Sequence, residues 1–148
     1  AAAAAAAEAD AAAAAKLQLP SVPYKTKAAG VTVVSLGVVQ QDRGAFADKK
    51  YVFPVGYRAT TVKGSWLKEG AKTTYTSEVI DGGGGFPLFR VTAEDDADNH
   101  ITGSSMSAVW KTAFQKIRKR ADVSVSGPQM FGMSDAVVAA MIGALPGY

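Results

Sequence analysis

The stretch KTTYTSEVIDGGGGFPLFRVT, residues 72–92, decides the fold. Its first part, 72–80, has the composition of a β-strand. The segment 81–85 is rich in glycine and turns the chain, and 86–92 returns it as the second strand of a hairpin. The side chains that share one face of the first strand are those of Tyr75, Ser77 and Val79. The centre of the chain is therefore predicted to be antiparallel sheet.

Two more strands are predicted upstream of this hairpin. Segment 31–39 is valine-rich and β-prone, and the single glycine inside it is typical of a bulge. Segment 51–57 is aromatic, but a proline and a glycine interrupt it. We therefore expect it to form an edge strand that bends into 58–62. The polar residues 40–50 predict a loop between the two strands.

Downstream of the hairpin the apolar residues follow helical spacing. Trp110, Phe114 and Ile117 recur at i, i+4 and i+7, and Ser107 can cap that helix. A second helix is expected from Ser134, with an apolar face formed by Val138, Met141, Ile142 and Leu145. Strands followed by helices predict the α+β class. We expect a single module: a mostly antiparallel sheet with C-terminal helices packed on one face.

Length and composition restrict the classes of protein that fit. The chain has 148 residues, enough for one domain with a core, and a formal net charge of +3. The absence of cysteine excludes a disulfide scaffold, a cysteine-based zinc site and a thiol nucleophile. No apolar run reaches the roughly 18 residues of a membrane helix. We therefore expect an intracellular protein without membrane contact.

The N-terminal residues 1–29 are predicted to be a tail and a linker. Alanine occupies 13 of the first 15 positions, which offers only methyl groups for packing. Two prolines in 17–23 are typical of an extended connector.

Three segments carry groups that could do chemistry, and each has a simpler explanation. The glycine run 82–85 could hold a phosphate, but a strand rather than a helix is expected after it, which favours a turn. The acidic run 94–98 lacks the spacing and the central glycine of a calcium loop. His100 has no nucleophile motif in support. We expect no catalytic, cofactor-binding or metal-binding residue.

The segment around 111–120 is basic. Cations at the end of a helix interact favourably with the helix dipole, which explains the charge without a ligand. A weak contact with a partner or with phosphate groups stays as an alternative. The residues that would make this contact are Lys111, Lys116, Arg118, Lys119 and Arg120.

Several stretches together resemble the two halves of the FY-rich family. VVSLGVV (33–39), DRGAF (42–46) and YVFPVGYR (51–58) resemble its N-terminal motif, FYRN. The C-terminal motif, FYRC, is resembled by YTSEVI (75–80), PLFRV (87–91), SSMSAVW (104–110), GPQMFGM (127–133) and ALPG (144–147). Gly44 and Met106 stand where the family favours proline. The resemblance places FYRN at about 30–68 and FYRC at about 72–148.

The resemblance implies that the two motifs interleave into one α+β module. It also implies that most of the conspicuous residues are structural: Tyr51, Phe53, Pro54, Gly56, Tyr57, Phe86, Phe89, Trp110, Phe114, Phe131 and Gly132. Gly37 would serve a tight backbone position.

In functional terms the resemblance implies association rather than catalysis. Such modules occur in trithorax-type histone methyltransferases, plant JmjC-type demethylases and a growth-factor-regulated nuclear protein. The leading expectation is a nuclear, non-catalytic protein-interaction module that recruits or holds together a histone-modifying or transcription complex. Its partners would be protein subunits, with no cofactor and no small-molecule substrate. Two alternatives stay open: a structural docking subunit of a large assembly, including one outside the nucleus, and weak nucleic-acid binding through the basic helix end.

Overall fold

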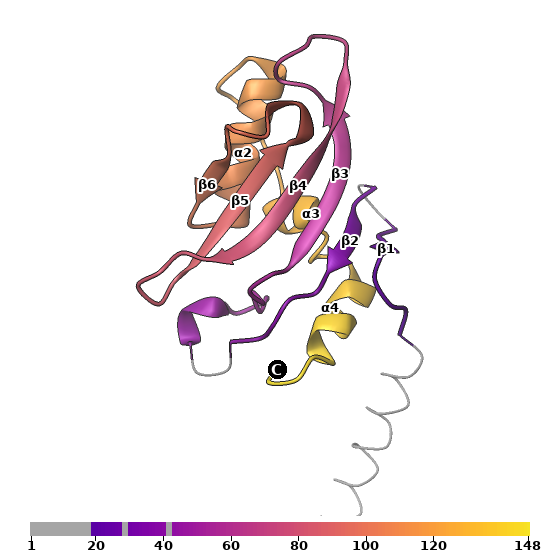
Figure 1. Ribbon diagram of the computed structural model, residues 1–148, viewed down its shortest axis with the longest axis vertical. Helices are drawn as coiled ribbons and strands as arrows, with labels where there is room; N and C mark the ends of the chain where they lie inside the picture. Colours follow the sequence, from indigo (N-terminus) through magenta and orange to yellow (C-terminus); the bar gives the residue numbers. More distant parts are fainter. Residues whose placement is uncertain (1–18, 28–29, 41–42) are drawn as a thin grey trace, which may run out of the picture.

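The computed structural model describes residues 19–27, 30–40 and 43–148. Its centre is one six-stranded antiparallel sheet in which neighbours in sequence are neighbours in space (Figure 1). The strands are β1 (Tyr24–Lys25), β2 (Thr32–Ser35), β3 (Arg58–Gly64), β4 (Lys72–Asp81), β5 (Pro87–Ala93) and β6 (Ile101–Gly103). The alanine-rich tail expected from the sequence lies outside the described residues.

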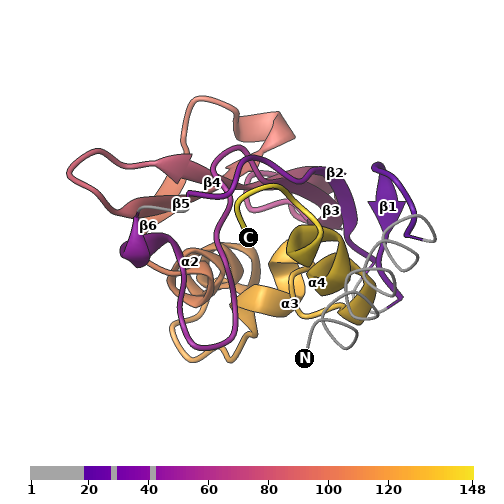
Figure 2. The same cartoon turned by 90° about the horizontal axis from the view of Figure 1, so that it is seen from below.

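The helices form a second layer. They are α2 (Met106–Arg118), α3 (Gly127–Phe131) and α4 (Ala136–Gly143), and all lie on the same face of the sheet (Figure 2). Two short 3-10 helices, η1 (Gly44–Phe46) and η2 (Glu94–Asp96), lie in connecting loops. The α+β class and the one-sided helical layer are confirmed. No helix in the described ranges is long and apolar enough to cross a bilayer.

The predicted hairpin is present as β4 and β5. Its register pairs Val79 with Phe89 and Ser77 with Val91, so these four side chains point into the core between sheet and helices. Edge-to-face aromatic contacts fill this layer, such as Phe89 against Phe131, whose ring centroids are 5.8 Å apart.

Buried polar groups on the core aromatics have partners. The indole Nε1 of Trp110 donates to Ser77 Oγ at 2.9 Å, and the hydroxyl of Tyr57 donates to the carbonyl of Phe131 at 2.7 Å. Burial raises the pKa of Tyr57 far above its usual range and that of Tyr75 to about 12. Both hydroxyls therefore stay protonated donors at neutral pH.

The segment 51–57 is not the edge strand that we expected. Val52 and Val55 form isolated bridges with Ala47 and Val38, and the backbone of Gly56 and Tyr57 bonds to Val79 just before β3 begins. Proline at 54 lacks an N–H for a ladder, and Gly56 adopts a left-handed conformation with φ +92°. The strand predicted over 31–39 likewise ends at residue 35.

Gly37 is required by a close approach of two backbones. It has φ +76°, and a Cβ there would lie 2.6 Å from the backbone of Val55 and Tyr57. The glycine thus lets the chain after β2 pack against the segment that enters β3.

Three elements were missed. β1 lies within the N-terminal part that we expected to be linker, β6 is three residues long, and α3 has five residues. Helix starts were also misplaced: Ser105 rather than Ser107 caps α2, and Asp135 rather than Ser134 caps α4. Such short elements depend on tertiary contacts more than on local composition.

Arg43, in the loop between β2 and β3, stacks on an aromatic ring and forms an ion pair with the sheet. Phe46 of η1 is buried, and the guanidinium of Arg43 lies 4.1 Å from the centroid of its ring. The same guanidinium binds Asp81 at the end of β4 through two hydrogen bonds of 2.6 and 3.0 Å. These contacts hold residues 43–46 beside the end of β4.

Acid should weaken this anchor. Arg43 and the backbone N–H of Gly83 hold the pKa of Asp81 at about 2. Because the folded pKa lies below the unfolded value, the carboxylate stabilises the fold above about pH 4 and loses that effect as pH falls towards 2. We expect Asp81→Asn to lower the free energy of unfolding at about pH 6 and to have a smaller effect near pH 2, measured by urea denaturation. Equal losses at both pH values would contradict this assignment.

Gly127 is a sharp test of the packing between α2 and α3. A Cβ at this position would lie 2.2 Å from the backbone nitrogen of Ser107, so Gly127→Ala forces α3 away from α2. We expect a loss of about 3 kcal/mol in unfolding free energy. Gly44→Ala is the matched control, since a Cβ there meets no atom within 4 Å. Similar denaturation midpoints for the two variants would show that the helices do not pack this closely.

Candidate functional site

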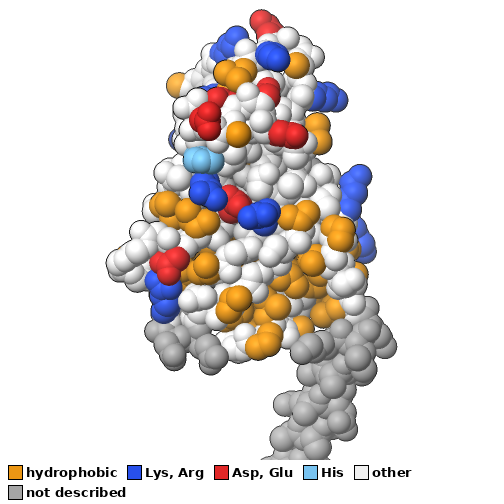
Figure 3. All heavy atoms as spheres, viewed as in Figure 1, with side chains coloured by type: hydrophobic (Ala, Val, Ile, Leu, Met, Phe, Trp, Pro, Cys, Tyr) orange, Lys and Arg blue, Asp and Glu red, His pale blue; other side chains and the backbone are white. Residues whose placement is uncertain are grey.

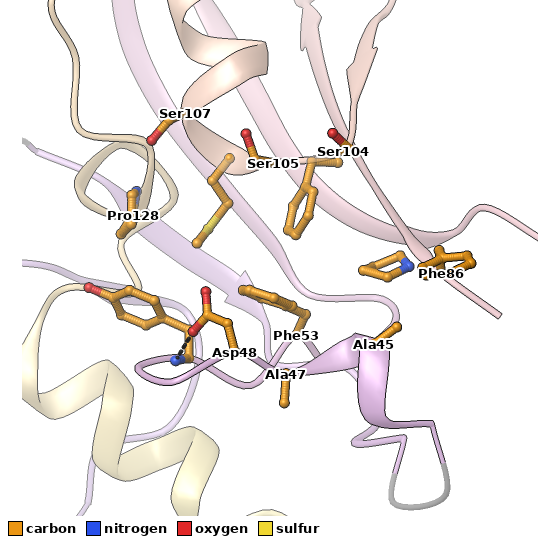
Figure 4. Close-up of a pocket in the computed structure, with 13 residues that line it drawn as sticks. Ala45, Ala47, Asp48, Phe53, Phe86, Ser104, Ser105, Ser107 and Pro128 are labelled. Atoms are coloured by element: carbon orange, nitrogen blue, oxygen red, sulfur yellow. Dashed lines mark hydrogen bonds between the residues drawn. The ribbon is translucent and has the colours of Figure 1, made fainter.

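A groove opens at the lower end of the molecule, where the β2–β3 loop meets the β4–β5 hairpin and the start of α2 (Figure 4). Its volume is about 440 Å³. The residues that line it are Ala45, Ala47, Asp48, Tyr51, Phe53, Phe86, Pro87, Phe89, Ser104, Ser105, Met106, Ser107 and Pro128. Four segments that are separate in the sequence, 45–53, 86–89, 104–107 and Pro128, thus meet at one site.

The groove has an apolar floor and an aromatic rim. Phe53, Phe89 and Met106 are buried, and the two rings meet edge to face at 5.0 Å. Tyr51 is half-buried, and Phe86 leaves 66% of its surface exposed. The prediction that Phe86 belongs to the core is wrong, because the glycine turn and Pro87 hold it at the hairpin end, away from the helical layer.

Three polar side chains of the groove, those of Asp48, Ser105 and Ser107, accept hydrogen bonds from the local backbone. Asp48 accepts from the backbone N–H groups of Lys50 and Tyr51, and Ser105 accepts from the N–H of Ala108 as the cap of α2. Ser107 accepts from the N–H of Gly127. Asp48 is the one charged side chain among the described lining residues. The arrangement suits the binding of an apolar group.

The segments weighed for chemistry have structural roles. The glycine run is a turn, and the N–H of Gly83 donates to Asp81. In the acidic run, Asp95 accepts from Ser65, and Asp96 accepts from Asn99 and from Trp66 Nε1, which lowers the pKa of Asp96. Nδ1 of His100 lies 2.8 Å from the hydroxyl of Thr92. Within the described residues, no group of three acidic or histidine side chains could hold a metal ion.

The five cations near the end of α2 differ in their surroundings. Lys116 lies 4.1 Å from the centre of the Trp66 ring, and Arg118 lies 4.9 Å from that of Phe114. Lys111 and Lys116 are five residues apart, which places them about 140° apart around the helix. Lys119 and Arg120 follow the helix end, with Lys119 in the left-handed region at φ 54° and Arg120 at 3.9 Å from Asp122.

Two family models match this chain. Residues 21–82 match the family model described as F/Y-rich N-terminus (FYRN), and residues 86–148 match F/Y rich C-terminus (FYRC). The chain belongs to the FY-rich family. The two matches meet at the glycine turn, later than the boundary at 68–72 that we expected, so β4 falls in one motif and β5 in the other.

Three relatives show the range of proteins with this module. Transforming growth factor beta regulator 1 of Xenopus tropicalis is 32% identical over 123 residues, which are 80% of this chain and 30% of that protein. Histone H3-lysine(4) N-trimethyltransferase ATX1 of Arabidopsis thaliana is 27% identical over 133 residues, 82% of this chain and 12% of the relative. Histone-lysine N-methyltransferase trr of Drosophila melanogaster is 24% identical over 135 residues, 82% of this chain and 6% of the relative. The chain spans less than a third of each.

The groove lies at the junction of the two family motifs. Tyr51 and Phe53 come from the FYRN match, and Phe86, Met106 and Pro128 come from the FYRC match. Sequence reasoning identified most of the aromatic lining as structural, but it did not identify the groove. An aromatic residue directly after a four-glycine turn is the signal that could have indicated exposure of Phe86.

The turn between the motifs should accept a long insertion. The turn is open to solvent: a Cβ added at Gly83, Gly84 or Gly85 would have no other atom within 4 Å. Lengthening the five-residue loop 82–86 by ten glycine and serine residues between Gly83 and Gly84 should cost about 1 kcal/mol, because closure entropy grows only with the logarithm of loop length. Urea denaturation measures the loss. The same insertion after Ser77 should prevent folding, and a folded product there would contradict the β4–β5 pairing.

Proposed function

We propose that this module is a non-catalytic protein-interaction module of a chromatin-associated regulator, which recruits or holds together a histone-modifying or transcription complex. The observation that carries the proposal is the groove between the two motifs. The occupant that fits it is a segment of another subunit that inserts a large apolar side chain beside Phe86 and over Phe53 and Phe89.

The groove leaves apolar surface exposed. A folded protein exposes single apolar residues without consequence, but the groove combines an exposed ring with an apolar cavity of about 440 Å³. That volume lies within the range of ligand sites, and burial of one large side chain contributes about 2 kcal/mol. The floor residues Phe53, Phe89 and Met106 are already packed in the core, so binding needs little reordering of the module.

The relatives support a setting in chromatin, and with it a nuclear location. Their names describe methyltransferases and a growth-factor regulator, and this chain corresponds to a small part of each. A methyltransferase activity in such proteins belongs to other parts of the chain. The module would serve such a parent protein by association.

Nucleic-acid binding through the basic helix end is the weaker candidate. Lys116 and Arg118 each lie beside an aromatic ring, and Lys111 and Lys116 project about 140° apart around the helix. A contact of this kind would be driven by phosphate and would weaken steeply with salt. Binding that survives nuclease treatment and high salt would argue for protein partners.

Phe86→Ser tests the groove. We expect it to reduce partner binding about tenfold, because the partner's apolar group loses the ring that covers it. Stability should be unchanged, since Phe86 is 66% exposed. Leu67→Ser is the matched control, because Leu67 is 53% exposed at a distance from the groove.

The measurement starts from immobilised wild-type and variant chains in nuclease-treated nuclear and cytoplasmic extracts, read by quantitative mass spectrometry. Proteins lost with Phe86→Ser and retained with Leu67→Ser are then purified, and their dissociation constants are measured. Equal affinity of a purified partner for both variants would reject the groove as its site. If the only proteins that lose binding with Phe86→Ser belong to a non-nuclear assembly, the docking-subunit alternative is favoured.

A further inference from the structure

None of the described helices α2, α3 and α4 covers the opposite face of the sheet, onto which Figure 3 looks, and the turn after η2 borders that face through Ala97 and His100. Across the middle of this face run Arg58, Glu78 and Arg90, which the register places side by side on β3, β4 and β5. We call these residues the charged row. Below it, hydrophobic side chains gather on the surface (Figure 3).

The apolar row below it is formed by Val38, Val55, Ile80 and Leu88. Val38 and Val55 pair through two backbone hydrogen bonds, and the side chain of Val38 is 67% exposed. Gly56 donates to the carbonyl of Val79, which brings residues 55–56 beside the end of β4. There Ile80 lies opposite Leu88, both on the face away from the helices.

The charged row carries an excess of positive charge with unused donors. Glu78 accepts from Arg58 Nε at 3.0 Å and from Arg90 Nε at 2.8 Å, with Arg90 Nη2 at 2.7 Å from the same carboxylate. Arg58 uses only Nε, so both of its Nη groups stay open on a side chain that is 55% exposed. A carboxylate placed here would meet a planar guanidinium already held in position.

We propose that this lower half of the open face binds an amphipathic segment of a partner protein. The apolar side chains of the segment cover the apolar row, and an acidic side chain along its edge takes the Nη groups of Arg58. The site lies on a different face from the groove and does not depend on it. A module with both sites contacts two segments at once and so bridges them.

Charge decides between this occupant and others. Two copies of the chain packed face to face would bring two rows of net positive charge together, which disfavours a second copy. A phosphate backbone would satisfy Arg58 but would leave the apolar row without a partner. Ala97 of the acidic turn 94–98 lies in the hollow that contains the charged row, beyond Thr76 and Thr92 and on the side away from the apolar row.

The test uses two 18-residue helical peptides with the same leucine stripe, one flanked by glutamates and one by lysines. Each is titrated into the ¹⁵N-labelled 148-residue chain. We expect the glutamate peptide to shift the amide signals of Val38, Val55, Ile80 and Leu88, and to bind about tenfold more tightly than the lysine peptide. Equal affinities, or shifts confined to the groove, would overturn the proposal.

Variants locate the contact. Val38→Ser should weaken the glutamate peptide about tenfold, as expected for the loss of one buried valine contact. Val62→Ser is the matched control, because Val62 lies on the same face at the other end of β3 and is 57% exposed. Arg58→Gln should weaken the glutamate peptide and leave the lysine peptide unchanged.

Two further outcomes separate this inference from the proposed function. Phe86→Ser should leave the glutamate peptide's affinity unchanged, and a loss there would place the peptide in the groove and overturn the inference. Sedimentation equilibrium of the chain alone should give a monomer. A dimer that Val38→Ser dissociates would assign the face to a second copy instead.

Discussion

The structure depends on the pairing of β4 with β5, because this pairing joins the two family motifs. It extends from Asp81 opposite Pro87 to Tyr75 opposite Ala93. Two buried hydrogen bonds hold the same halves together on the helical side, from Tyr57 to Phe131 and from Trp110 to Ser77. Neither motif has a complete sheet or a covered core without the other.

The parts of the fold that could be predicted are those with a strong local signal. The hairpin follows from β-branched residues around a glycine turn, and α2 follows from the spacing of Trp110, Phe114 and Ile117. The missed parts are fixed by distant contacts: Phe46 is buried although it lies in a polar segment, and the N–H of Lys27, beside β1, bonds to Asp135 at the start of α4. No local pattern encodes such contacts.

The candidate site was not predicted from the sequence, although several of its residues were identified as structural. The family motif correctly drew attention to aromatic positions, and Phe53 and Phe89 are buried there. The groove exists because η1, the hairpin end and the cap of α2 converge, and their distance in sequence conceals this. Phe86 was misjudged because its neighbours in sequence resemble a core strand, whereas its place at the turn is set by Pro87 and the glycines.

On the face of the sheet away from the helices, Glu78 holds two arginine side chains in position. Glu78 is only 7% exposed although it points away from the core, because two arginine side chains cover it. A buried carboxylate needs such partners, and its removal would leave two cations repelling each other. Glu78 therefore orients Arg90 fully and Arg58 in part, and the part of Arg58 that it leaves free defines the chemistry of what can dock beside the apolar row.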